Sequence, residues 1–288
     1  MFPGISVIIP LYNKECTISH TIKSVQSQNY DNWELIIVDD GSTDKSGQIV
    51  EEYLNDDRIK YYYKENGGPS SARNFGVDKA SKKWILFLDA DDYFLPDAFV
   101  TYGNLIQQNS DIRFFVCDFW RECDTNRKLY SYKYKNGILK NNFFAWLFGR
   151  CMPRTGACIV HKSLCIKYPY NEKLRRFEDA GVIFKMFAKC KVLTCKTPVM
   201  VYNKNTSAAS KGRDDINEDY VSCMDLNNGS FWERMAKYDL LFQNMKLYPE
   251  QLKTLYPQEA RKWHIWIFLK LCHYVNVVES RAYKLFNR

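Results

Sequence analysis

The chain has 288 residues, of which 46% are hydrophobic and 26% are charged. A chain this long and this apolar can bury a core, so its composition excludes wholesale disorder, a collagen-like protein and a disulfide scaffold. The 41 Lys and Arg residues exceed the 33 Asp and Glu residues, which leaves a formal charge of +8. This modest excess favours anionic partners, and phosphorylated small molecules, anionic lipid and RNA all remain open.

Ten cysteines raise the question of metal sites and disulfide bonds. No two of them form a C-x-x-C pair, and none of the four His residues joins them at the spacing of a zinc site. The N-terminus runs directly into a strand-like segment, without the basic region or the cleavage site of a signal peptide. We therefore expect a cytoplasmic chain with reduced thiols.

Short apolar runs alternate with amphipathic stretches in residues 1–120. The apolar runs predict strands at Ile5–Pro10, Trp33–Asp39, Ile59–Tyr63, Trp84–Leu88 and Ile112–Asp118. Helical spacing predicts helices at Thr17–Gln28, Lys45–Leu54, Ser70–Ala80 and Pro96–Gln108. This alternation is typical of an α/β fold, with a mostly parallel sheet flanked by helices. Such sheets bind ligands at the carboxyl ends of their strands, so we expect a site in the loops that begin at Pro10, Asp39 and Leu88.

Acidic residues cluster at the predicted strand ends. The clusters are Asp39-Asp40, Asp89-Ala90-Asp91-Asp92 and, before a predicted helix, Glu178-Asp179. Hard oxygen ligands suit Mg²⁺ or Mn²⁺, which proteins bind through one or two carboxylates together with substrate phosphates. We expect Asp89 and Asp91 to hold such an ion with a diphosphate. The alternative for this D-x-D tripeptide is a capped and solvated turn.

Asp179 suits a different role. A carboxylate held away from the metal can deprotonate an acceptor hydroxyl while the leaving group departs on the other side. An acidic pair at the start of the predicted helix Ala180–Ala188 is equally natural as an N-terminal cap that favours the helix dipole. From the residues alone, both roles stay open.

Four sequence blocks stand out in the first third of the chain: SVIIPLYNKE at Ser6–Glu15, ELIIVDDGSTD at Glu34–Asp44, ENGGPSSARNFG at Glu65–Gly76 and WILFLDADD at Trp84–Asp92. Together they resemble family 2 of the inverting glycosyltransferases. Their order and spacing match the family, and the resemblance returns at Phe177–Asp179. The family implies a GT-A fold, which is a Rossmann-like nucleotide-binding unit with an acceptor-side extension. It also implies transfer of a sugar from a nucleoside diphosphate-sugar with inversion.

The matching positions imply roles for individual residues. Those that would contact the nucleotide-sugar are Pro10, Tyr12, Asp39, Asp40, Asn66, Arg73 and Asp89. Asp40 would accept a hydrogen bond from uracil, which favours a UDP-sugar as the donor. Asp91, with Asp89 beside it, would bind Mn²⁺ or Mg²⁺, and Asp179 falls on the family's catalytic base. We expect one sugar to be transferred per encounter, without processive synthesis.

The chain departs from the family in the segment that closes over the diphosphate. The family has a Tyr followed by Arg and Ser, whereas no Arg follows Tyr202 directly. Lys204, Lys211 and Arg213 are alternatives for this phosphate contact. The acceptor-side segment Arg150–Ala157 also departs from the form common in relatives, which leaves the acceptor open.

The resemblance divides the chain into two regions. Residues 1–212 would form the catalytic domain, with nucleotide-sugar binding at about 1–118 and the acceptor side at about 119–212. A helical region would follow over residues 213–288. A stretch of small and charged residues, Asn205–Asp215, marks the boundary between them.

The segment Gln243–Arg288 carries eight Lys and Arg residues against three Asp and Glu residues. One face of a predicted helix within it holds Trp263, Ile267, Leu271, Val275 and Val278. A basic amphipathic helix can lie on an anionic membrane surface, which would make the protein peripheral on the inner face of the cell membrane. The alternative is a helix that packs its apolar face on the catalytic domain.

We expect a glycan or lipid-linked glycan as the acceptor, in the assembly of cell-surface polysaccharide or lipopolysaccharide. Two alternatives are a sugar nucleotidyltransferase and a non-catalytic module that binds sugar nucleotides or glycans. A nucleotidyltransferase needs a Gly-rich loop after the first strand, and Leu11–Glu15 contains no glycine. No nucleic-acid-binding motif is present, so we expect no nucleic-acid partner. The sequence leaves open whether the chain forms homo-oligomers.

Overall fold

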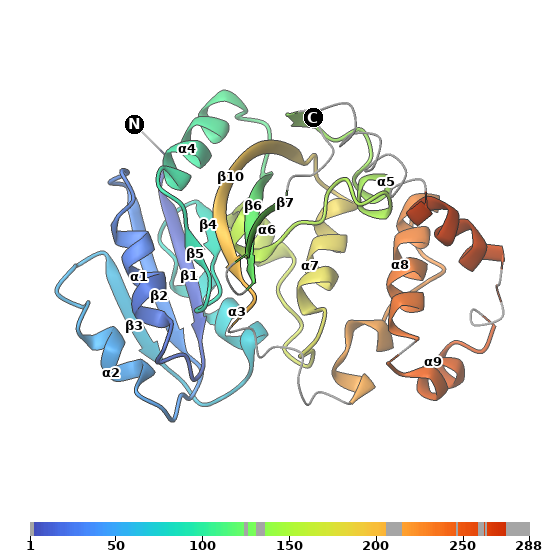
Figure 1. Cartoon of the computed structure of the whole chain (residues 1–288), viewed down its shortest axis with the longest axis horizontal. Helices are drawn as coiled ribbons and strands as arrows, with labels where there is room; N and C mark the ends of the chain where they lie inside the picture. The colour runs from blue at the N-terminus through green and yellow to red at the C-terminus, as the bar shows by residue number, and fades with distance from the viewer. Residues whose placement is uncertain are drawn as a thin grey trace.

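The structure is a computed structural model that describes residues 3–123, 126–130, 136–205, 215–245, 247–258, 262 and 264–274. A sheet runs through its centre, and helices flank it (Figure 1). This architecture confirms the predicted α/β fold class. The predicted boundary segment lies almost entirely outside the described residues, as does the whole chain beyond residue 274.

The first four strands form a parallel half of the sheet. They are β1 (Ile5–Leu11), β2 (Trp33–Asp39), β3 (Ile59–Tyr63) and β4 (Trp84–Phe87). β1 pairs with β2 and with β4, and β2 pairs with β3, all in parallel. Every residue of β2 and β4 is buried, as expected for parallel strands covered on both faces. The pairing register brings the carboxyl ends of β1, β2 and β4 to one edge of the sheet.

Four helices follow these strands along the chain: α1 (Ile18–Gln26), α2 (Ser46–Glu51), α3 (Pro69–Lys79) and α4 (Ala98–Gln108). α3 begins at Pro69, a position where the missing N–H of proline costs no helical hydrogen bond. Gly76 lets this helix approach β1 closely, because a Cβ at this position would lie 2.3 Å from Cγ2 of Ile8. α3 therefore packs directly on β1.

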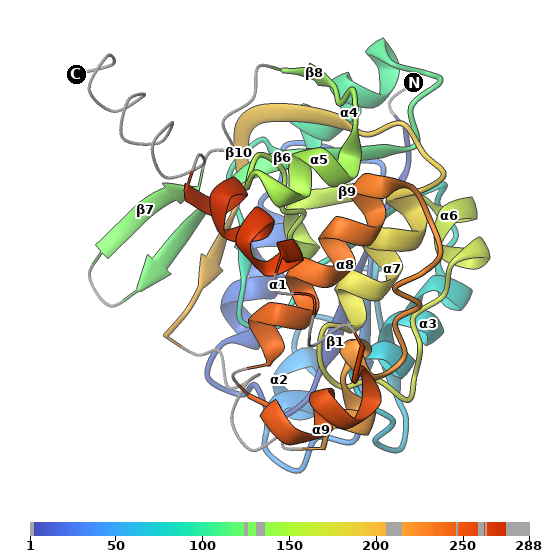
Figure 2. The same cartoon turned by 90° about the vertical axis from the view of Figure 1, so that its right-hand side faces the viewer.

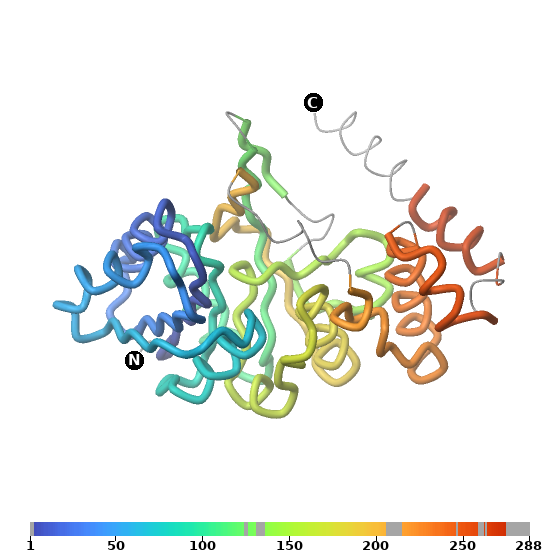
Figure 3. The backbone as a smooth tube through the Cα atoms, turned by 90° about the horizontal axis from the view of Figure 1, so that it is seen from below, coloured from blue at the N-terminus to red at the C-terminus, as the bar shows by residue number. Residues whose placement is uncertain are grey.

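The second half of the sheet mixes strand directions. Its strands are β5 (Tyr93–Phe94), β6 (Phe114–Cys123), β7 (Asn126–Tyr130), β8 (Gly137–Ile138), β9 (Cys158–His161) and β10 (Leu193–Asn203). The order across the sheet is β3-β2-β1-β4-β9-β6-β10-β5, with β7 beside β6 and β8 beside β10. β9 is antiparallel to β4 and β6, whereas β10 is parallel to β6. The β6–β7 hairpin projects away from the body of the protein (Figures 2 and 3).

The later helices are α5 (Asn142–Leu147), α6 (Lys162–Lys167), α7 (Glu178–Phe187), α8 (Phe231–Asn244) and α9 (Pro249–Leu255). Residues 264–274 are also helical. α8, α9 and residues 264–274 gather at the end of the molecule farthest from β1–β3, and α8 packs against α5 (Figure 1). They form the expected C-terminal helical appendage.

The helix at residues 264–274 packs through a face other than the predicted one. Leu269 and Cys272 are buried, whereas Ile267 is 42% exposed and Leu271 is 57% exposed. Outside the described residues lie the other members of the predicted face, Trp263, Val275 and Val278. None of the helices in the described ranges is both long enough and apolar enough to cross a bilayer.

Candidate active site

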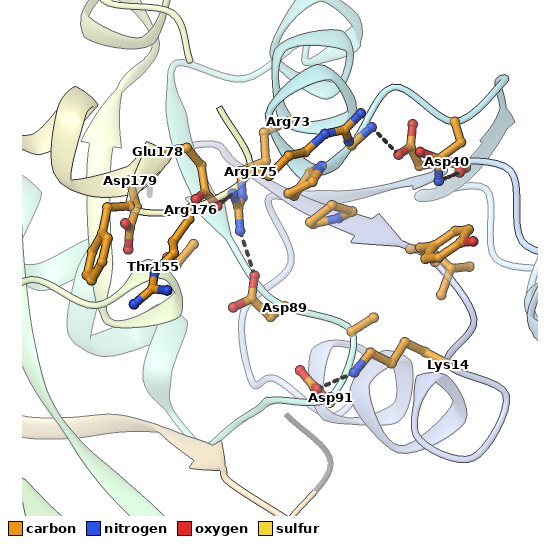
Figure 4. Close-up of a pocket in the computed structure, with 18 of the residues that line it drawn as sticks. Lys14, Asp40, Arg73, Asp89, Asp91, Thr155, Arg175, Arg176, Glu178 and Asp179 are labelled. Atoms are coloured by element: carbon orange, nitrogen blue, oxygen red, sulfur yellow. Dashed lines mark hydrogen bonds and ion pairs between the residues drawn. The ribbon is translucent and has the colours of Figure 1, made fainter. Parts of the chain in front are cut away.

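A cavity of about 510 Å³ opens at the carboxyl ends of β1, β2 and β4. The predicted nucleotide-binding residues that line it are Pro10, Tyr12, Asp40, Asn66, Arg73 and Asp89. The predicted metal ligand Asp91 and the predicted base Asp179 line the same cavity. Figure 4 shows Asp89 near the middle of the view, Asp91 below it beside Lys14, and Asp179 to the left beside Glu178. The structure therefore brings together residues that are up to 169 positions apart in the sequence.

Asp39 is the predicted site residue that does not line this cavity. It is buried beneath the turn after β2, where its Oδ1 accepts a hydrogen bond from the backbone N–H of Ser42 (2.7 Å). Its Oδ2 accepts another from the hydroxyl of Tyr61 (2.7 Å). Burial and this hydrogen bond raise the pKa of Tyr61. In this structure Asp39 supports the turn that presents Asp40.

Asp40 is held at the N-terminus of α3. Its Oδ2 accepts a hydrogen bond from the N–H of Gly68 (2.6 Å), and its Oδ1 accepts from the N–H of Gly67 (2.9 Å) and from Nζ of Lys64 (2.6 Å). Gly68 has a φ of +86°, and the guanidinium of Arg175 fills the space that a Cβ would need. Glycine is therefore required at position 68. Asp40 is thereby held in one position at the cavity wall.

The turn that carries Asp89 and Asp91 is tied to α1. The hydroxyl of Thr21 donates to the carbonyl oxygen of Ala90 at 3.0 Å. Oδ2 of Asp91 lies 2.5 Å from Nζ of Lys14, which follows β1 (Figure 4). These contacts fix the turn and the carboxylate of Asp91 at the cavity wall.

Arg73 joins the two acidic sides of the cavity. Its Nη2 donates to Oδ1 of Asp89 and its Nη1 donates to Oε1 of Glu178, each at 3.0 Å. Burial alone would lower the pKa of Arg73. The charge of Asp89 and the other acidic groups around it outweigh this effect, so the pKa is raised. A permanently charged guanidinium in α3 thus links the end of β4 to the start of α7.

Asp179 lies in the first turn of α7. The preceding Phe177 has a φ of +52°, a strained conformation for a residue with a side chain, and it turns the chain into the helix. Oδ1 of Asp179 accepts from the N–H of Ala180 (2.8 Å). Burial and the neighbouring Asp179 raise the pKa of Glu178. Asp179 therefore lies at a helix N-terminus and also lines the cavity. This position is compatible both with a helix cap and with a base that deprotonates an acceptor.

The carboxylates of Asp89 and Asp91 fit a divalent ion that arrives with phosphate. Within the described ranges, no three or more His, Cys, Asp or Glu side chains form a group that could hold a metal by themselves. Mg²⁺ typically binds through one or two carboxylates, with waters and substrate phosphates as its other ligands. Two carboxylates at this cavity are therefore a sufficient protein contribution for an ion carried by a diphosphate.

Arg154 and Arg175 are among the cations of the cavity wall that were not predicted as site residues from the sequence. Arg154 precedes the short helix Thr155–Ala157, and its guanidinium stacks on the ring of Tyr202 at the end of β10. Neither arginine belongs to a recognisable motif, and β9 and β10, which bring Arg154 and Tyr202 together, were not predicted either. Of the three predicted phosphate contacts, Lys204 is not among the residues that line the cavity. The other two lie outside the described residues: Lys211 and Arg213.

Comparison with known proteins shows the family of the chain. The family model "Glycosyl transferase family 2" matches residues 6–168, and the chain belongs to this family. An uncharacterized glycosyltransferase of Rickettsia conorii is 37% identical over 185 residues, which cover 64% of this chain and 30% of that protein. The GalNAc(5)-diNAcBac-PP-undecaprenol beta-1,3-glucosyltransferase of Campylobacter jejuni is 39% identical over 102 residues, which cover 34% of this chain and 33% of that protein. The chain thus spans about a third of the length of these two relatives.

The fold is similar to that of a solved structure. The crystal structure of S. aureus TarS 1-349 in complex with UDP-GlcNAc matches with a TM-score of 0.62 and 19% identity, over 85% of this chain and 67% of that chain. Together with the family match, this likeness confirms the GT-A fold that the resemblance implied.

Proposed function

We propose that the chain is a metal-dependent inverting glycosyltransferase that transfers one sugar from a UDP-sugar to a glycan or lipid-linked glycan. The observation that carries the proposal is the cavity in which Asp40, the pair Asp89 and Asp91, and Asp179 meet, with Arg73 between them. Two named relatives support the substrate classes. One is TarS, solved with UDP-GlcNAc, and the other is the Campylobacter jejuni enzyme, whose name describes an undecaprenol-linked glycan.

In this reaction Asp179 takes the proton of an acceptor hydroxyl as the hydroxyl oxygen attacks the anomeric carbon. The bond between that carbon and the diphosphate oxygen breaks, and the diphosphate leaves with the electron pair. Attack and departure occur on opposite faces, so the configuration inverts. Asp89 and Asp91 would hold Mn²⁺ or Mg²⁺, which when bound offsets the charge of the leaving diphosphate. Arg73 keeps Asp89 and Glu178 oriented on the two sides of the cavity.

Replacement of Asp179 by Asn tests this assignment. The variant should bind UDP with nearly unchanged affinity in calorimetry, because Asn keeps the shape of the side chain. Release of UDP from a UDP-sugar should fall by roughly 10²- to 10⁴-fold, the usual contribution of a general base. Asp111→Asn is a matched control, because Asp111 is exposed and pairs with Lys191 on the surface. Loss of UDP binding in Asp179→Asn, or full turnover, would exclude Asp179 as the base.

The donor nucleotide can be identified by thermal stability. We would measure the unfolding midpoint with UDP, GDP, CDP and TDP, each with and without Mn²⁺, on the wild type and on Asp91→Ala. A ligand that binds only the folded state raises stability by RT ln(1 + [L]/Kd). A Mn²⁺-dependent rise with UDP that Asp91→Ala abolishes is expected. A rise with GDP or TDP alone would change the donor, and no rise with any nucleotide would favour a non-catalytic module.

The proposal extends to a cytoplasmic protein that contacts the inner face of the cell membrane through residues 264–274. Exposed apolar side chains on this helix are Trp266, Ile267, Leu271 and Tyr274. Lys270 lies over the ring of Trp266, so a cation accompanies the apolar face. A double variant with Ser at Trp266 and Leu271 should sediment less with phosphatidylglycerol vesicles than the wild type. Leu255→Ser, on α9, is the control, and equal sedimentation of all three proteins would exclude the membrane contact.

A further inference from the structure

Arg154 differs from the other cations of the cavity wall. Lys14 pairs with Asp91, and Arg73 pairs with Asp89 and Glu178. Within the part of the chain that the structure describes, Arg154 makes no side-chain hydrogen bond or ion pair. Its buried Nε also lacks a partner, as does the Nε of Arg73. A buried polar group without a partner costs free energy, which makes its position informative.

Stacking holds this side chain in place. The central carbon of the Arg154 guanidinium lies 3.3 Å from the ring centroid of Tyr202. Stacking uses the flat face of the guanidinium and leaves the N–H donors in its plane available. The result is a fixed, planar donor group at the wall of a cavity that already holds several carboxylates.

The charges around Arg154 come from the turn after β4 and from the start of α7. Burial lowers the pKa of Arg154, but the charges of Asp92 and Asp89, and more weakly that of Asp179, raise it. Arg154 therefore lies within electrostatic range of the predicted metal ligand Asp89 and of the predicted base Asp179. A group that leaves between these two sides would pass next to the guanidinium.

We propose that Arg154 binds the diphosphate of the donor and stabilises its charge as it leaves. This inference rests on the proposed function and deepens it. When the bond between the anomeric carbon and the diphosphate oxygen breaks, the electron pair stays on that oxygen, and the acceptor proton goes to Asp179. The in-plane N–H groups of Arg154 match the paired oxygens of a phosphate group. Tyr202 lacks an Arg directly after it in the sequence, and Arg154 supplies a guanidinium to its ring from another part of the chain.

Calorimetry of UDP and uridine binding tests this role, in the presence of Mn²⁺ and with the full chain. Arg154→Met should weaken UDP binding by roughly 10- to 100-fold, the range expected for hydrogen bonds to a charged group, and leave uridine binding unchanged. Arg154→Lys should weaken UDP binding less, because it keeps the charge but loses the planar donor pair. Arg150→Met is a matched control, since Arg150 stacks on Phe144 and does not line the cavity.

The outcomes separate this inference from the proposed function. Selective loss of UDP affinity in Arg154→Met, with uridine affinity kept, supports a phosphate contact. Equal losses for UDP and uridine, or no loss in either, overturn it even if the wild type binds UDP and turns over. Failure of the wild type to bind any nucleoside diphosphate overturns both. If Arg154→Met does not fold, Arg154→Lys decides by the same comparison of UDP with uridine.

Discussion

Replacement of Lys14 by Met should strengthen the binding of Mn²⁺ in the absence of nucleotide. Nζ of Lys14 lies 2.5 Å from Oδ2 of Asp91, and the two side chains are only 23% and 10% exposed. A divalent ion that binds Asp91 must displace this ammonium group, so the ion pair competes with the metal. Met has a similar length and no charge, and it removes the competitor while filling the same space.

The size of the effect follows from the strength of the ion pair. A hydrogen bond to a charged group contributes about 1.5–3 kcal/mol, and pairs in full contact with water contribute less. The Asp91 side chain is mostly buried, so we use the value of about 1.5–3 kcal/mol for this pair. Removing the pair should therefore lower the Kd for Mn²⁺ by roughly 10- to 150-fold.

Electron paramagnetic resonance of free Mn²⁺ measures this Kd without any need for turnover. Lys64→Met is the matched control, because Lys64 pairs with Asp40 at 2.6 Å and its loss removes the same charge without releasing Asp91. Only a small change is expected in this control. A Kd for Lys14→Met equal to or weaker than that of the wild type would refute the competition between Lys14 and the metal.

The remaining predictions concern pH and stability, measured by urea unfolding. Burial raises the pKa of Glu34, but hydrogen bonds led by those from Ser6 and Ser81 outweigh it and lower this pKa from 4.5 to about 2. The stabilisation is present above about pH 4.5 and is lost as the pH falls towards 2, so Glu34→Gln should cost about 2–3 kcal/mol at pH 7 and much less near pH 2.5. A cost that does not change with pH would contradict this. The hydrogen bond to Asp239 raises the pKa of His273 against the effect of burial. That stabilisation is present below about pH 6.5 and is lost as the pH rises through the folded-state pKa, so His273→Asn should be more destabilising at pH 6 than at pH 9. The difference should stay under about 1 kcal/mol because the His273 side chain is 49% exposed.

The parallel half of the sheet could be predicted from the sequence because each of its strands is a local signal. β2 and β3 have the predicted bounds, since the run LIIV in β2 and the three tyrosines in β3 are typical of strands and are flanked by polar and turn residues. β9 and β10 were missed for physical reasons. β9 has four residues, and β10 contains Lys196 and Pro198 and changes its register with β6 on both sides of Pro198. A short run and an interrupted run both lack the periodicity that identifies a strand.

The carboxylates of the site were predictable because each lies in a short motif at a strand end or a helix start. Their partners were not, since the pairs Arg73–Glu178 and Arg154–Tyr202 join distant segments that only the folded sheet brings together. The C-terminal helix makes a related point. Its apolar residues indicate an amphipathic helix, but the face that packs is set by α8 and the rest of the body, which helical periodicity does not encode.

The strand order also bears on how the protein forms during synthesis. β3, β2, β1 and β4 are neighbours in the sheet and are all complete once residue 87 has been translated. The wall of the cavity that holds Asp40 and Arg73 can therefore assemble early, as N-terminal segments do when they emerge first from the ribosome. Glu178, to which Arg73 also binds, is still about 90 residues from being translated at that point. We therefore expect the nucleotide side of the cavity to be structured before the side that carries Asp179 exists.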